Sequence, residues 1–283
     1  MTLSSSLICL SILILIISTF ADRHQYQFAA DYPCNAFNDE SKVASYMDKV
    51  IKYEGKFISE GIGFNKLSGF TYEGHIIEVH NNSITELKVL NYSSPSQESI
   101  HLSLLALAIS ANPLATKLFG GIDNVISILD RKITTYESFN NRHPGFGCFV
   151  PWVDIDIDSG EITISKSWAK PYPILPAWQN GVFFWSLYAL AHELQKQSGT
   201  KFQALAVRFR ALVDCQKRNA HTIFYRGNGE ISSMAIVLND QVLLLSECPI
   251  VIFLLIFVHI YKFIYIISNY YNRNCQIPTT IKQ

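Results

Sequence analysis

Carboxyl groups that could catalyse a hydrolysis are few, and their spacing alone does not pair them. Glu73, Asp154 and Glu247 fall in loops or at the ends of expected elements, where functional groups often sit. Cleavage of a glycosidic bond usually needs two carboxyl groups that face each other across that bond. The sequence does not show which carboxylates face each other, and each of the three fits an ordinary surface position equally well. The catalytic residues therefore stay unassigned.

Three aspartates at alternate positions suggest a second possible function, the binding of calcium. Asp154, Asp156 and Asp158 match the start of an EF-hand loop, where alternate positions supply oxygen ligands. The loop glycine comes one position late, however, and Ser165 stands where the bidentate glutamate is needed. Isoleucines alternate with the aspartates as a strand requires. We therefore expect a hairpin with an acidic outer face, and neither a metal site nor a cofactor.

The cysteines do not show metal-ligand spacing either. One lies in the apolar N-terminal run, and the others are far apart in the chain: Cys34, Cys148, Cys215, Cys248 and Cys275. One or two disulfides are compatible with an oxidising compartment. The spacing leaves their pairing open.

Two loops rich in aromatic residues, proline and glycine could form the walls of a binding cleft. They read HPGFGCFVPW over 143–152 and KPYPILPAWQNG over 170–181. Aromatic rings often line sugar clefts, but they fill large cores too. Ordinary loop packing explains these two segments about as well as a cleft does.

The elements that must position these groups are expected to be mainly helical. Ser94, Pro95 and Gln97 predict a capping box at a helix start, and Asp39 can cap an earlier helix. The helix after Ser94 is apolar almost all round, so we expect it to be buried. Apolar residues mark the expected helices over 41–58, 99–110, 122–133, 184–194 and 202–213.

Small β elements are expected between the helices. A hairpin is predicted over 153–164, another near 222–237 with its turn at 227–229, and a long loop with short strands over 60–92. Successive helices with broad apolar faces suggest an α/α barrel or another helical array. No residue-level repeat is visible, so a solenoid is less favoured.

The N-terminus predicts entry into the secretory pathway. The apolar run Leu7–Phe20 fits the h-region of a signal peptide, with cleavage after Ala21, although no Lys or Arg precedes it. An uncleaved signal anchor is the alternative, and both interpretations place the rest of the chain outside the cytosol. Sequons at Asn81 and Asn91 would then be glycosylation sites. Lys+Arg and Asp+Glu are balanced at 23 each, so no charge excess indicates nucleic acid.

Five segments, in order along the chain, resemble the SGL-type endo-β-1,2-glucanases, especially their eukaryotic branch. They are GFTYEGH, SSPSQESIHLSLLALAI, HPGFGCFVPW, LPAWQNGVFFWSLYALAHEL and RNAHTIFYRGNGEI, within about 37–237. The resemblance implies a metal-free cleft that hydrolyses linear β-1,2-glucan with inversion. The implied fold class is mainly α, an incomplete (α/α)6 barrel with small β-hairpin insertions. The cleft positions that match are Tyr72, Glu73, His75, Trp152, Trp178 and Asn180.

The sequence also departs from the pattern of that family. Cys148 stands where glycine is usual, and Gln179 and Val182 stand where acidic residues are usual. The resemblance stops after the second hairpin, whereas the family's general acid is expected just beyond that point. We therefore expect 22–248 to be a partial barrel domain, because twelve helices and their connections need well over about 300 residues.

The C-terminal region 249–283 fits no barrel. Its apolar run over 250–267 is long enough for a transmembrane helix, although His259 and Lys262 are unfavourable there. A buried helix and a sequence foreign to the family are the other interpretations, and the last is favoured.

The expected function is that of a secreted or membrane-anchored β-1,2-glucanase-like hydrolase, inactive if the barrel is incomplete. A non-catalytic glycan-binding protein is the alternative, and a membrane-tethered helical protein without a sugar role is the second.

Overall fold

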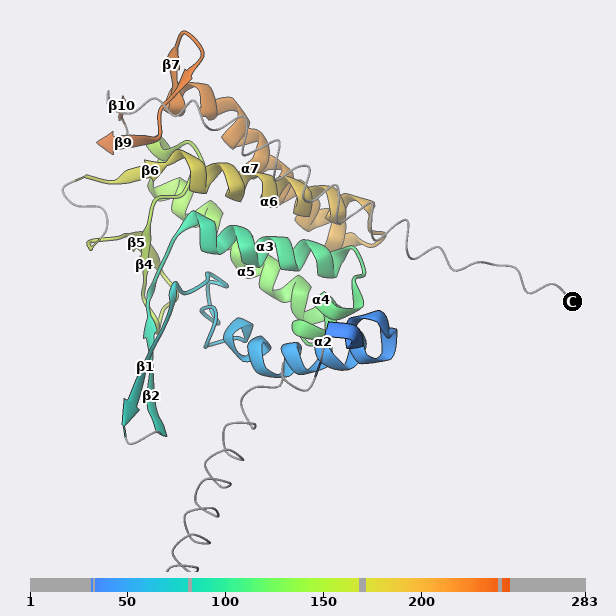
Figure 1. Ribbon diagram of the computed structural model, residues 1–283. Helices are drawn as coiled ribbons and strands as arrows, with labels where there is room; N and C mark the ends of the chain where they lie inside the picture. The colour runs from blue at the N-terminus through green and yellow to red at the C-terminus, as the bar shows by residue number, and fades with distance from the viewer. Residues whose placement is uncertain (1–31, 33, 81–82, 168–171, 239–240, 245–283) are drawn as a thin grey trace, which may run out of the picture.

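The computed structural model describes residues 32, 34–80, 83–167, 172–238 and 241–244 (Figure 1). The predicted signal peptide over 1–21 and the C-terminal region 249–283 lie outside the described residues, as does the sequon residue Asn81. Within the described part, no helix combines the length and apolar character that a membrane crossing requires. Membrane anchorage therefore gains no support from these elements.

The predicted mainly helical fold is confirmed, while a complete (α/α)6 barrel stays a prediction. The α-helices are α2 (Glu40–Glu54), α3 (Pro95–Ile109), α4 (Pro113–Leu118), α5 (Ile122–Arg142), α6 (Ala177–Lys196) and α7 (Thr200–Phe224). Three short 3-10 helices accompany them: η2 (Cys34–Asn38), η3 (Gly55–Ile58) and η4 (Pro144–Phe146). The predicted helix over 41–58 is thus α-helical only to Glu54 and continues as 3-10 helix.

Side-chain caps set the helix starts where the sequence predicted them. Ser94 Oγ accepts a hydrogen bond from Gln97 N (3.4 Å), and Pro95 occupies the first turn of α3. Asp39 Oδ1 accepts from Ser41 N (2.9 Å) at the start of α2. Each cap satisfies backbone N–H groups that the helix itself leaves without a partner.

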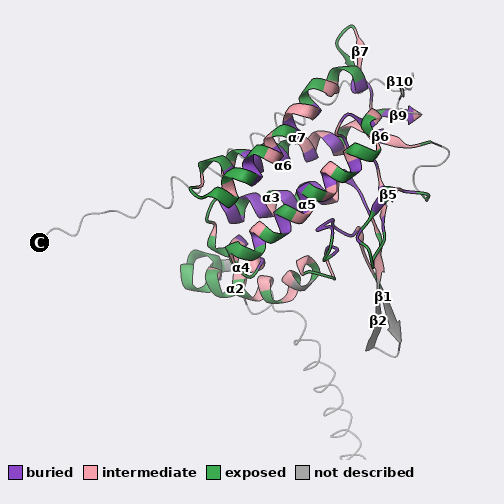
Figure 2. Ribbon diagram, turned by 180° about the vertical axis from the view of Figure 1, so that it is seen from behind, coloured by how far each residue is buried: buried purple, intermediate pink, exposed green. Residues whose placement is uncertain are grey.

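The long helices form two layers. α3 and α6 lie side by side, joined by a hydrogen bond between Ser103 Oγ and Ser186 Oγ (3.0 Å), and α5 and α7 pack behind them (Figures 1 and 2). The core between the layers is built from apolar residues of all four helices, among them Leu102, Leu105, Leu129, Ile133, Phe183, Leu187, Phe209 and Val213.

The outer side of the α3/α6 layer is apolar and only partly covered. Ile100 is 59% exposed and Leu107 47% on α3, and Trp185 is 49% exposed on α6. The prediction that the helix after Ser94 is buried is therefore wrong for one side of α3. The α3 helix is apolar all round because two of its sides are apolar, but only one of these sides packs on the core.

The loops and small sheets gather at one end of the helices, on the left in Figure 1. One antiparallel sheet has the order β3-β4-β5, another β10-β9-β6, and two hairpins are β1-β2 and β7-β8. The strands are β1 (Gly74–His80), β2 (Ser83–Leu90), β3 (Tyr92–Ser93), β4 (Val153–Ile155), β5 (Ile162–Ile164), β6 (Ile174–Pro176), β7 (Tyr225–Gly227), β8 (Glu230–Ile231), β9 (Met234–Leu238) and β10 (Gln241–Leu244).

Both predicted hairpins are confirmed, the first with the predicted ends and the second in a shorter form. Val153 pairs with Ile164 across β4 and β5, and the turn over 227–229 joins β7 to β8. The second prediction, near 222–237, is too wide: residues 222–224 complete α7, and residues 234–237 belong to β9, which pairs with β6 and β10. The expected long loop over 60–92 contains a hairpin of seven- and eight-residue strands, β1 and β2.

The aspartates of the β4–β5 hairpin stabilise the hairpin itself. Asp154 accepts hydrogen bonds from Ser165 Oγ (2.6 Å) and Lys166 N (2.9 Å). Asp156 accepts from Ser159 N (2.7 Å) and Ser159 Oγ (2.9 Å), and these bonds lower the pKa of the Asp156 carboxyl. The hairpin interpretation of this motif is therefore confirmed.

A disulfide between Cys148 and Cys215 joins the loop before β4 to α7. Cys148 has φ of 70°, a left-handed conformation that favours glycine, and the preceding Gly147 has φ of 58°. The glycine expected at position 148 from the family resemblance would adopt this backbone conformation without strain. Here a cysteine adopts the same conformation and is bonded to α7.

Candidate functional site

A cavity of about 300 Å³ lies between the first half of α3 and the segment that enters β1. It brings together the predicted residues Tyr72, Glu73 and His75. Apolar side chains form much of its wall, and the polar groups come from both sides. Its lining also includes Phe57, Phe64, Ile100 and His101.

Glu73 supplies the carboxylate of this cavity. Its Oε2 accepts a hydrogen bond from Ser94 Oγ (3.3 Å), and its backbone N–H donates to Tyr92 O (2.7 Å). Ser94 therefore both caps α3 and contacts Glu73, which couples the carboxylate to the helix start. Among the described residues that line the cavity, Glu73 is the single Asp or Glu.

His101 is a buried, unpaired imidazole in the same cavity wall. It is 4% exposed and packs between Phe64 and Phe119, with ring centroids 4.9 and 5.4 Å away. Neither ring nitrogen has a hydrogen-bond partner within the described part of the chain. Burial, assisted by the charge of Lys132, lowers the pKa of His101 well below its usual value. The neutral ring therefore offers one donor and one acceptor.

His75 adds a further unpaired nitrogen. Its Nδ1 is buried without a partner among the described residues, and its ring lies 6.1 Å from that of Phe57. Buried polar groups are normally hydrogen-bonded to protein, water or ligand. The two imidazoles and Glu73 therefore suit a ligand that carries several hydroxyl groups, and the neighbouring aromatic and aliphatic walls suit its C–H faces.

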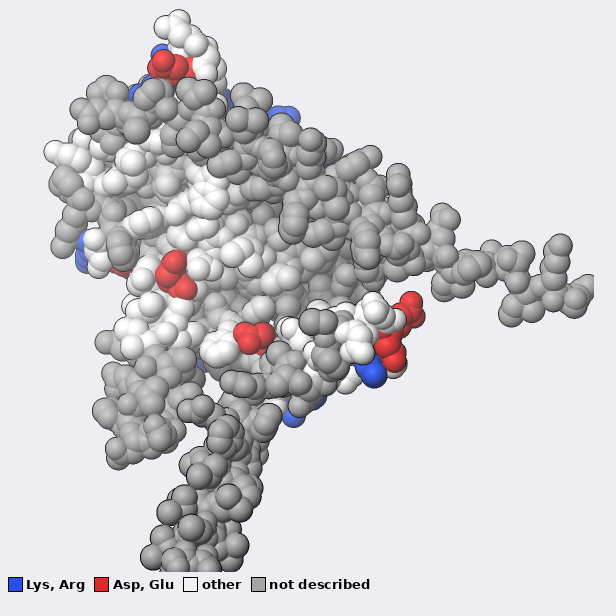
Figure 3. Space-filling model, viewed as in Figure 1, with Lys and Arg blue, Asp and Glu red and all other residues white. Residues whose placement is uncertain are grey.

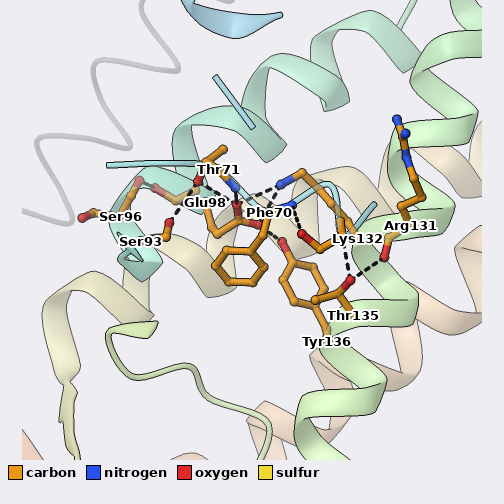
Figure 4. Close-up of polar contacts among 11 residues, drawn as sticks. Phe70, Thr71, Ser93, Ser96, Glu98, Arg131, Lys132, Thr135 and Tyr136 are labelled. Atoms are coloured by element: carbon orange, nitrogen blue, oxygen red, sulfur yellow. Dashed lines mark hydrogen bonds and ion pairs between the residues drawn. The ribbon is translucent and has the colours of Figure 1, made fainter. Parts of the chain in front are cut away.

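A buried polar network fixes the backbone next to this cavity (Figure 4). Glu98 on α3 accepts hydrogen bonds from Thr71 N (2.6 Å), Thr71 Oγ1 (2.7 Å), Lys132 Nζ (2.8 and 2.9 Å) and Tyr136 Oη. Because Thr71 precedes Tyr72 and Glu73, the network positions the residues that line the cavity. Burial lowers the pKa of Lys132 against the opposing effect of Glu98, and burial and Glu98 raise that of Tyr136.

The remaining predicted residues have structural contacts. Tyr72 is 6% exposed, and its Oη accepts from Asn65 Nδ2 (3.1 Å). Trp152 Nε1 donates to Gln179 Oε1 (2.6 Å), and Trp178 is 43% exposed on the first turn of α6. Asn180 is fully buried and bonds both the N–H and the carbonyl of Val150 (2.9 and 3.0 Å), so it holds the preceding loop.

The structure does not gather all six predicted residues in one cavity. Tyr72, Glu73 and His75 share the cavity described above, while Asn180 lines a second one, of about 480 Å³, between α6 and α7. Trp152 and Trp178 line neither of these two cavities. Trp152 directly precedes β4 and Trp178 lies in the first turn of α6, and the Trp152–Gln179 hydrogen bond joins these two segments.

Comparison with known families decides the relationship. The family model for endo-β-1,2-glucanase SGL matches residues 70–248, which include the cavity residues from Thr71 onward and all of α3 to α7. The chain belongs to the SGL endo-β-1,2-glucanase family.

Solved structures show the same relationship. This SGL-family chain is similar to endo-β-1,2-glucanase from Talaromyces funiculosus in complex with sophorose, with a TM-score of 0.69 and 26% identity over 78% of this chain. A mutant of that enzyme in complex with β-1,2-glucan gives a TM-score of 0.68 at the same identity and coverage. The chain spans 46% of the length of each of these proteins. A search of curated proteins found no match.

Three important residues of this SGL-family chain were not singled out from its sequence. His101 lies inside an apolar run, and Lys132 falls on the apolar face of α5 at helical spacing from Leu129. A polar residue at a core position is the signal that could have identified both. Glu98 carries no such signal, because it follows the helix cap, where glutamate is common.

Proposed function

We propose that this protein acts on β-1,2-glucan as an inverting glycoside hydrolase, and that the cavity around Glu73 forms part of its glucan-binding surface. Family membership supports the reaction, and the two similar structures hold sophorose and β-1,2-glucan. The observation that carries the proposal is the grouping of Glu73 with the unpaired nitrogens of His75 and His101 in one cavity. We further propose that the described helices correspond to part of an (α/α)6 barrel.

The geometry suggests how a glucosyl unit would bind. Its hydroxyl groups would donate to the Glu73 carboxylate and exchange hydrogen bonds with the neutral His101 and with His75. Phe57 and Ile100 would contact its C–H faces. In an inverting reaction, one carboxylic acid protonates the leaving oxygen while a second carboxylate activates water. Among the described lining residues of this cavity, Glu73 is the carboxyl group that could serve in either role.

A glucan-binding protein without hydrolytic activity is the second candidate function. It is favoured by one observation: the described part of the cavity wall contributes a single carboxylate, whereas inverting hydrolysis uses two. In this alternative, Glu73 and the two histidines bind glucan and no bond is broken.

Both functions can be separated in one series of measurements. The full chain is incubated with linear β-1,2-glucan, the release of oligosaccharides is followed by chromatography, and sophorose binding is measured by calorimetry. Release of oligosaccharides supports the hydrolase, and binding without release supports the alternative. Absence of both would refute the two functions together.

Glu73→Gln tests the assignment within that series. If Glu73 is an acid or base, the variant should lower the hydrolysis rate by roughly 10²–10⁴. Glu230→Gln, on the exposed β7–β8 hairpin, is the matched control and should keep the original rate. A Glu73→Gln protein that hydrolyses glucan as fast as the control would remove Glu73 from the reaction.

A further inference from the structure

The second cavity has a construction unlike that of the first. It encloses about 480 Å³ between the first half of α6 and the last turns of α7. Its wall is mainly aromatic: Phe184 and Trp185 come from α6, Phe224 and Tyr225 from the junction of α7 and β7, and Phe149 from the loop before β4. Aromatic rings from three segments thus surround one space of ligand size.

This wall is held rigidly. The Cys148–Cys215 disulfide and a hydrogen bond from Gln216 Nε2 to Cys148 O (2.9 Å) tie the loop to α7. Asn180 ties the next part of the loop to α6 through Val150. Phe149 lies between these attachments, is 4% exposed and meets Phe224 edge to face at 5.0 Å. The cavity is therefore formed before any ligand arrives, which lowers the entropic cost of binding.

One buried acceptor in this wall lacks a partner. Gln216 is fully buried, and its Oε1 has no hydrogen-bond partner among the residues that the structure describes. The bond from Nε2 to the Cys148 carbonyl fixes the orientation of the amide, because only the NH₂ group can donate there. A ligand with one O–H group directed at Gln216 would satisfy Oε1.

The charge of the cavity is one-sided. Lys217 and His221 are exposed and lie one helical turn apart on α7, and the described lining includes no Asp or Glu. An anionic group on the ligand is therefore favoured at this edge. A sugar is disfavoured, because most of its hydroxyl groups would lose water against aromatic walls without a partner.

We propose that this cavity binds a small phenolic acid. Its planar ring packs between the aromatic residues of α6 and α7, its phenolic O–H donates to Gln216 Oε1, and its carboxylate lies toward Lys217 and His221. This site is separate from the glucan-binding cavity around Glu73, so its ligand does not depend on the proposed hydrolysis.

Calorimetry on the full chain tests the ligand class. The probe is 4-hydroxycinnamate, and cinnamate, which lacks the phenolic O–H, is the matched compound. Cinnamate should bind about tenfold more weakly, the effect of one unpaired buried acceptor. Sophorose should not displace 4-hydroxycinnamate. Absence of 4-hydroxycinnamate binding, equal binding of the two acids, or displacement by sophorose would each overturn the proposal.

Substitutions locate the site. Ala220→Phe fills the cavity without removing a polar contact and should abolish binding of 4-hydroxycinnamate. Lys217→Ala should weaken binding severalfold, whereas Lys201→Ala, at the exposed start of the same helix, should not. Circular dichroism confirms that each variant is folded. Unchanged binding to folded Ala220→Phe would place the acid elsewhere and refute the assignment.

Discussion

His101 combines deep burial with a ring that stays neutral, and this makes stability depend on pH. Its folded-state pKa is lowered, while the unfolded chain has a pKa of about 6.5. Below about pH 6.5 the unfolded state therefore binds a proton that the folded state does not. The stability contribution is present above that pH and is lost as the pH falls toward the folded-state pKa, by up to about 1.4 kcal/mol per unit.

We predict that His101→Leu flattens this pH dependence. Leucine removes the titrating group and the unpaired ring nitrogens while remaining compatible with Phe64 and Phe119. The measurement is the free energy of unfolding by urea between pH 4.5 and 7.5. His192→Gln, at an exposed position of α6, is the control and should follow the wild-type slope. An identical slope for His101→Leu and wild type would contradict the burial argument.

The Cys148–Cys215 pair leads to a second prediction. Cys215→Ser removes the disulfide between two residues that are 67 positions apart, and it should reduce the free energy of unfolding by about 2–5 kcal/mol. Adding Cys148→Gly in that background should recover about 1 kcal/mol, because glycine adopts the φ of 70° without steric cost. Thermal and urea unfolding measure both steps.

The matched control for that recovery is Cys148→Ala in the same Cys215→Ser background. Alanine removes the sulfur but keeps the Cβ that disfavours the left-handed conformation. Equal stability of the alanine and glycine variants would show that the backbone at residue 148 does not cost free energy.

Glu73 and His75 were predictable from the sequence, but the groups around them were not. The resemblance of GFTYEGH indicated the segment, whereas the hydrogen-bond partners of Glu73 are Ser94 and Tyr92, and further cavity residues come from α3. Contacts between segments far apart in the chain depend on how helices pack, and spacing along one segment does not encode them. His101 and Lys132 were visible only as polar residues in apolar stripes.

Between elements, the Glu98 network joins α3 to α5 beneath the cavity. Lys132→Met should lower the free energy of unfolding by about 3–5 kcal/mol, because it leaves the fully buried Glu98 without its positive partner. Glu98→Gln combined with Lys132→Met should recover part of that loss. The neutral amide oxygen can still accept from Thr71 or Tyr136.

Urea unfolding of the two single variants and the double variant measures this coupling. If the losses of unfolding free energy in the two single variants simply add in the double variant, Glu98 and Lys132 do not interact energetically despite their contact. Lys201→Met is the control for the loss of a lysine on an exposed helix surface and should be nearly neutral.

The elements themselves were predictable to different degrees. Ser94 and Asp39 set helix starts through local hydrogen bonds, so the sequence predicted those starts correctly. The length of the β1–β2 hairpin was underestimated, because the glycines before it suggested a long loop with only short strands. The pairing of β6 with β9 joins residues about 60 positions apart and had no local signal.

For the whole molecule, the described face over α3 and α6 carries few charged side chains (Figure 3). The layer has one side in the core and one apolar side outward, the arrangement expected of inner helices in an α/α barrel. The sequence predicted this helical array from apolar stripes and the family resemblance. It did not predict that the candidate site residues fall in two separate cavities, with Trp152 and Trp178 in neither of them.

Secretion is a prediction for the whole chain. Expressed in a eukaryotic host, the mature protein should begin near Asp22 and carry glycan at Asn81 or Asn91. Asn91 is exposed, and its Nδ2 donates to Ile155 O (3.1 Å), so a glycan would leave the second amide hydrogen for this bond. N-terminal sequencing and mass spectrometry before and after deglycosylation measure both features.

The control for the glycan is Asn91→Gln, which should remove the modification at that sequon while retaining the amide. An unglycosylated cytosolic product that still begins with Met1 would show that the apolar run Leu7–Phe20 does not direct secretion.

The disulfide before β4 has a topological consequence. Cys148 and Cys215 close a covalent ring that contains β4, β5, β6, α6 and much of α7. The exposed Lys166 and Lys196 both lie inside this ring. A protease that cuts after either lysine therefore opens the ring without releasing a fragment. The nicked chain stays one covalent molecule until a reductant separates it, with α6 and α7 still attached through the loop that shapes the second cavity.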